Sequence, residues 1–319
     1  MNEEWYDVFL DTLYKKYPKK NQLVDALMDI LCIEREAVYR RLRKHVMFPA
    51  NEIIKIASVC NISLDKITNV DGGKINFLMH QVNYTEPSEY DVQYLRNNVK
   101  LLKGLGTSSK SEFMAICNKL PRSLNAGFPS LYRFFLFKWE YQYGNSGVTI
   151  PYSQINIPES IRQISSDFYT SMRYIANTDY VFDHNMLDYF VGDIRYFHSI
   201  HLISDSEKEL IKKDLHTLLN YLSNIAGYGC FPETKNKVNI YISQINIDTN
   251  YSCFCDENMK TFRIHVFNKY EMQTYDDATV SKFRNWMQLK KRAAIQISVT
   301  DEKSRIDFFR NQNQLVDSL

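Results

Sequence analysis

The densest group of side chains able to contact a phosphate or the edge of a base lies near the start of this 319-residue chain. These side chains are Arg35, Glu36, Tyr39, Arg40, Arg43 and Lys44. An arginine guanidinium can donate two parallel hydrogen bonds to the O6 and N7 atoms of guanine. Arginine and lysine can both neutralise a phosphate. Val38 and Leu42 are four positions apart and would anchor the opposite face to a core. The pattern predicts a helix over residues 34–44 with a basic outer face.

The position of a residue along this helix decides whether it suits a base edge or a phosphate. Residues near the start of a helix in the major groove reach base edges most easily, which favours Arg35, Glu36, Tyr39 and Arg40. Arg43 and Lys44 come near the far end and suit phosphates better. A basic run of this kind can also be solvated surface, or a face that docks a protein.

Short helices are predicted around this one. Apolar residues recur at every fourth position within 3–17 and again within 21–31. Asn51 is expected to cap a fourth helix, and Ser63 to begin a fifth. The first seventy residues therefore predict a domain of five short helices.

The stretch LVDALMDILCIEREAVYRRLRKHVMFPANEIIKIASVCNISLDKI, residues 23–67, resembles the helix-turn-helix domain of phage repressor and Cro proteins. Its last part, EIIKIASVCNISLDKI, resembles the segment that closes the core of that five-helix domain. More narrowly, AVYRRLR followed by F..NEI..IA resembles a group of Bacteroidetes regulators with a large uncharacterised C-terminal domain. The resemblance covers about residues 1–70 and implies that the helix over 34–44 enters the major groove of DNA.

Two positions depart from that family's pattern. The turn, where the family usually has glycine, carries Cys32, which must then adopt a conformation that glycine adopts more easily. Glu34 stands where a serine or threonine commonly caps the second helix, and it is a weaker cap.

The remainder of the chain predicts a different organisation. The glycine pair in Asn69–Lys74 predicts a hinge, within a linker over 71–90. Helical periodicity predominates over 91–226, whereas alternation in segments such as Lys237–Ile247 predicts strands and helices mixed over 227–319. The predicted fold is mainly α with an α+β C-terminal part, in which residues 91–319 form an effector or oligomerisation region.

Composition limits the function classes. The hydrophobic fraction of 45% argues against disorder, and a net charge of only +2 means that any nucleic-acid footprint must be local. We find no signal peptide, no apolar run of membrane-spanning length and no CxxC pair, and therefore expect a cytoplasmic protein without membrane contact. Nucleotide-binding and serine-hydrolase motifs are missing, so an enzyme is not expected.

Three weaker signals in the sequence have structural explanations. His198 and His201 share a helical face at a spacing that metals can use, with Asp193 and Asp205 as the nearest carboxylates. Surface or structural histidines are the default, and no metal or cofactor is predicted. Cys253 and Cys255 would lie on one face of a strand as small buried residues. The aromatic cluster over 132–141 is expected to be core packing; the alternative is a pocket lining.

The function that these patterns predict is sequence-specific DNA binding by a transcriptional regulator. The alternative is a protein-interaction module whose basic helix face is incidental. A homodimer is expected because two aligned helices can read half-sites one helical turn apart on double-stranded DNA. Residues 91–319 could respond to a small-molecule or protein effector, an expectation that rests on analogy.

Overall fold

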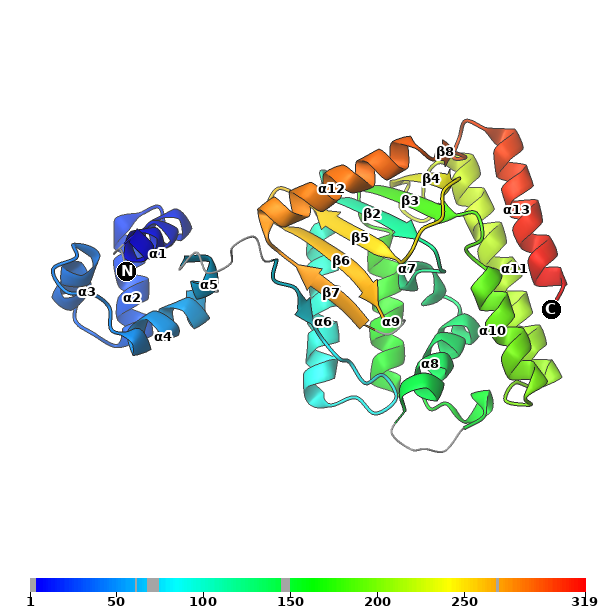
Figure 1. Cartoon of the computed structure of the whole chain (residues 1–319), viewed down its shortest axis with the longest axis horizontal. Helices are drawn as coiled ribbons and strands as arrows, with labels where there is room; N and C mark the ends of the chain where they lie inside the picture. Colours follow the sequence, from blue (N-terminus) through cyan, green and yellow to red (C-terminus); the bar gives the residue numbers. More distant parts are fainter. Residues whose placement is uncertain (1–3, 61, 68–74, 145–149, 268–269) are drawn as a thin grey trace. The chain divides into compact units, whose positions relative to one another are not determined.

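The computed structural model describes residues 4–60, 62–67, 75–144, 150–267 and 270–319. The chain divides into two compact units, Met1–Ile75 and Asn76–Leu319 (Figure 1). The hinge predicted at Asn69–Lys74 lies outside the described residues.

Short helices make up the first unit. They are α1 (Glu4–Lys16), α2 (Lys20–Leu31), α3 (Arg35–Leu42), α4 (Ala50–Cys60) and α5 (Leu64–Ile67). The predicted helix over 34–44 was therefore too long at both ends. Asn51 lies inside the first turn of α4 and does not cap it, because α4 already begins at Ala50.

The core of this unit is built from the apolar positions that recur along α1–α4. Phe9, Leu27 and Val38 have no exposed surface, so α1, α2 and α3 all contribute to one cluster. The hydroxyl of Tyr6 accepts a hydrogen bond of 3.0 Å from the backbone N–H of Phe48. This bond ties the loop before α4 to α1.

The second unit is α+β. Its elements are β1 (Leu78–Met79), α6 (Glu89–Leu105), β2 (Glu112–Cys117), α7 (Arg122–Asn125), α8 (Pro129–Tyr143), η1 (Tyr152–Gln154), α9 (Glu159–Met172), β3 (Asn177–Asp183), α10 (Asp188–Ser199), α11 (Asp205–Tyr228), β4 (Lys237–Ser243), β5 (Tyr251–Cys255), β6 (Lys260–Val266), β7 (Tyr270–Thr274), α12 (Asp277–Arg292), β8 (Ile295–Gln296) and α13 (Glu302–Asp317). The described strands form one mixed sheet in the order β1-β7-β6-β5-β2-β3-β4-β8. In it, β2, β3 and β4 are parallel, and the other pairings are antiparallel.

The sheet corrects the predicted division of residues 91–319. Strands β2 and β3 lie inside the segment 91–226 that was predicted to be mainly helical, and they join strands from 227–319 in the same sheet. Both strands are buried almost throughout, so they lack the polar alternation that would have revealed them. The end of the predicted linker is also structured: β1 pairs with β7, and Val82 and Tyr84 are buried in the core of the second unit.

Helices cover both faces of this sheet (Figure 1). Phe113 and Ala115 of β2 belong to the large core that includes residues of α6, α8, α9, α10, α11 and α13. Met114 and Ile116, which alternate with them, belong to a smaller cluster under α12. The larger core surrounds the cavity described below.

Candidate nucleic-acid interface

The turn between α2 and α3 contains a residue with a left-handed backbone. Cys32 adopts the left-handed conformation, with φ 57° and ψ 45°, and its backbone N–H donates to the carbonyl oxygen of Met28 at 2.8 Å. This confirms the prediction that Cys32 must take a conformation favoured by glycine. The turn directs α3 so that Val38 and Leu42 are buried against the core.

The start of α3 lacks a side-chain cap. Glu34 has an extended backbone and makes no capping hydrogen bond, as the weaker cap in its sequence suggested. Glu36 is exposed in the first turn, where a negative charge interacts favourably with the helix dipole.

Tyr39 forms a platform for two cations. The ring is half-buried against the core, and the guanidinium of Arg43 lies over it at 5.5 Å from the centroid. The ammonium of Lys20, from the start of α2, lies at 5.8 Å from the same ring. Lys20 was not among the predicted site residues, because its place beside Tyr39 depends on how α2 packs against α3.

Arg40 is exposed, and among the described residues its guanidinium makes no hydrogen bond or ion pair, while its backbone carbonyl oxygen accepts from the N–H of His45 at 2.9 Å. Arg35 is also exposed but pairs with Asp25, and both side chains keep more than half of their surface accessible. An exposed pair of this kind contributes little to stability, so Arg35 can exchange partners at small cost.

The last two predicted site residues lie beyond the helix. Arg43 follows α3 as its C-terminal cap, and Lys44 has a left-handed backbone with φ 61°. Lys44 also forms an exposed ion pair with Asp7 of α1. The prediction that Arg43 and Lys44 belong to the end of the helix was therefore wrong. Both remain on the surface, Arg43 beside Tyr39 and Lys44 beside α1.

One arginine of the basic run has a structural role. The guanidinium of Arg41 donates two hydrogen bonds to the carboxylate of Glu52, at 2.7 and 2.9 Å, and a third to the carbonyl oxygen of Ala37 at 3.1 Å. The two charged side chains are 18% and 14% exposed, respectively. This pair joins α3 to α4 and fixes which side of α3 faces outward.

The histidines and carboxylates considered as metal ligands do not form a site. His198 makes a contact of 2.9 Å with Asp205, while Asp193 pairs with Lys138, so these groups are not gathered around a common point. The part of the chain that the structure describes contains no group of three or more His, Cys, Asp or Glu side chains placed to hold a metal.

Comparison with known proteins gives no guide to function: no family model, curated protein or solved structure is detectably similar to this chain. Among the described helices, none is both long enough and apolar enough to cross a membrane.

Proposed function

We propose that this chain is a sequence-specific DNA-binding transcriptional regulator whose first unit is a repressor-like helix-turn-helix domain. The observation that carries the proposal is the outer side of α3, where Arg40 and Glu36 are exposed and Val38 and Leu42 face the core. An eight-residue helix with this division of faces can lie along a major groove. The left-handed turn at Cys32 supports the same geometry.

The proposed contacts to DNA depend on where each residue lies along α3 and the turn after it. Arg35, Glu36 and Arg40 lie at the start and middle of α3 and would read base edges. Arg43 and Lys44, in the turn that follows, would contact phosphates and fix the position of the helix. Tyr39 would hold Arg43 in place through its ring and contribute its own edge to the interface.

A homodimer on double-stranded DNA follows from this proposal. One short helix reads few base pairs, whereas two copies related by a twofold axis read half-sites about 34 Å apart and gain affinity together. The protein would act in the cytoplasm of a bacterial cell, where the DNA is accessible. Residues 76–319 would then supply dimerisation or effector response.

Selection of DNA from a random pool by the full chain tests the proposal. We expect an enriched sequence that binds at least 10³-fold more tightly than random DNA at physiological salt. Arg40→Ala should reduce that preference, whereas Arg162→Ala, an exposed arginine of α9, should not. Equal binding to all sequences would exclude sequence-specific regulation. Capture of a protein partner that is insensitive to Arg40→Ala would favour an interaction module.

A further inference from the structure

A cavity of about 480 Å³ lies within the second unit. Residues of α6, α7, α8, α9 and α10 line it together with strands β2, β5, β6 and β7 of the sheet. Its volume is in the range of sites that hold small organic molecules. The proposed role of the first unit does not involve this cavity.

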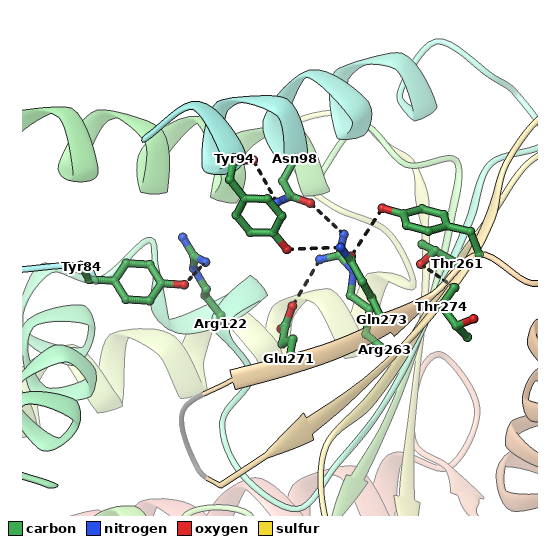
Figure 2. Close-up of polar contacts among 10 residues, drawn as sticks. Tyr84, Tyr94, Asn98, Arg122, Thr261, Arg263, Glu271, Gln273 and Thr274 are labelled. Atoms are coloured by element: carbon green, nitrogen blue, oxygen red, sulfur yellow. Dashed lines mark hydrogen bonds and ion pairs between the residues drawn. The ribbon is translucent and has the colours of Figure 1, made fainter. Parts of the chain in front are cut away.

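Arg122, at the start of α7, is the unusual group in its lining. The guanidinium lies 5.1 Å from the ring centroid of Tyr84 and 5.0 Å from that of Phe168. Its Nη1 donates a hydrogen bond of 2.9 Å to the hydroxyl of Tyr84 (Figure 2). The Nε atom is buried and has no hydrogen-bond partner. A buried donor without a partner is costly, which indicates a place for an acceptor that the chain does not supply.

The guanidinium of Arg122 also lacks a direct ion-pair partner among the described residues, although the carboxylate of Glu271 interacts with it electrostatically. Burial raises the pKa of Tyr84, so that this hydroxyl is neutral and cannot act as a counterion. No carboxylate of the described chain forms an ion pair with Arg122. A half-buried cation whose Nε atom is shielded from solvent is stabilised by an anion.

The carboxylates around the cavity have other partners. Glu271 accepts from Arg263 at 3.3 Å, and Arg263 also donates to the amide oxygen of Asn98 at 3.1 Å (Figure 2). Asp193 pairs with Lys138. The lining contains four Lys or Arg and three Asp or Glu side chains, which leaves one excess positive charge when His80 and His265 are neutral.

The apolar side chains that line the rest of the cavity determine the shape of a ligand that would fit. Aromatic rings such as Phe135, Tyr189, Phe190 and Phe254 line the cavity beside aliphatic side chains. The rings of Tyr84 and Phe168 lie near the guanidinium of Arg122, and its Nη1 is already used. A carboxylate approaching in the guanidinium plane, toward Nε, would satisfy the free donor.

We propose that this cavity binds a small organic monoanion with a flat apolar body, of the aromatic carboxylate class, with its carboxylate against the Nε side of Arg122. The apolar body lies among the aromatic walls. This binding does not depend on DNA binding by the first unit, so either proposal can fail without the other.

Calorimetric titration of the full chain tests this site with 2-naphthoate as the probe and its neutral isostere 2-naphthamide as the control. For a ligand of this size we expect 2-naphthoate to bind with a Kd of about 1 mM or tighter, and 2-naphthamide at least 10-fold more weakly. Equal affinity for the two compounds, or no heat from 2-naphthoate at several millimolar, overturns the proposal. This comparison needs no variant and therefore does not depend on the folding of a mutant.

Substitution then locates the binding site. Arg122→Gln should weaken 2-naphthoate binding at least 10-fold. Arg162→Gln removes an exposed arginine elsewhere in the same unit and should leave the affinity unchanged. Unchanged binding in a folded Arg122→Gln protein overturns the assignment. If Arg122→Gln does not fold, Arg122→Lys retains the charge but loses the planar fork and should also bind more weakly.

Discussion

Replacing Arg41 with methionine should loosen the first unit selectively. Arg41 and Glu52 are 18% and 14% exposed, and their two hydrogen bonds connect α3 to α4. Methionine keeps much of the length of the side chain but leaves the carboxylate of Glu52 without its partner. The loss should therefore come from the charged hydrogen bonds more than from packing.

The size of this effect follows from the geometry. A hydrogen bond to a charged group contributes about 1.5–3 kcal/mol, and the partial exposure of both side chains places the expected loss near 2 kcal/mol. A free-energy change of this size accelerates amide exchange through local opening by about 30-fold. The accelerated amides should be those of α3 and α4, while the second unit should exchange as in the wild type.

Hydrogen exchange followed by mass spectrometry measures this in the full chain. Arg35→Met is the matched control, because it removes an arginine of the same helix whose ion pair with Asp25 is exposed. We expect less than about 0.5 kcal/mol from the control, or roughly a twofold change in exchange. If Arg41→Met exchanges at the wild-type rate, the pair does not hold α3 against α4.

Three further outcomes are expected. Cys32→Gly should stabilise the first unit by about 0.5–1 kcal/mol, and Cys32→Val should destabilise it by about 1–2 kcal/mol, because φ is positive at this position; exchange of the α2 amides checks both. Arg43→Ala should reduce the slope of log affinity for the selected DNA against log salt by about 1, measured by fluorescence anisotropy. The hydrogen bond from His198 lowers the pKa of Asp205, so the contribution of this carboxylate to stability is complete above its ordinary pKa and is lost as the pH falls through the lowered value. An NMR titration should find that pKa raised by His198→Gln, and an unchanged value would contradict the assigned cause.

The first unit was the more predictable part of the chain. Its helices follow from apolar residues four apart, and the conformation of Cys32 follows from its place in the turn. The roles within the basic run could not be separated by sequence. Arg40 and Arg41 are adjacent and identical in type, yet only Arg41 meets Glu52, eleven positions away, and this depends on how α3 packs against α4.

The second unit was harder to predict for a physical reason. Strands β2 (EFMAIC) and β3 (NTDYVFD) are buried almost throughout, so neither sequence shows the regular alternation of a half-exposed strand, and β3 even buries polar side chains such as Asp179. The cavity brings together side chains from positions 80 to 271, a grouping that no local pattern reveals. The aromatic cluster over 132–141 combines both of its interpretations, since Phe134 is core and Phe135 lines the cavity.

The most direct test of the central claim is methylation interference on the selected DNA, which modifies guanine N7 in the major groove. Recognition by α3 in the major groove predicts that methylation at one or more guanines of the site blocks binding of the wild-type chain. It also predicts that Arg40→Ala binds weakly but no longer distinguishes methylated from unmethylated DNA at the guanine it contacts. Binding by the wild-type chain that is insensitive to N7 methylation throughout a guanine-containing site would contradict recognition by α3 in the major groove.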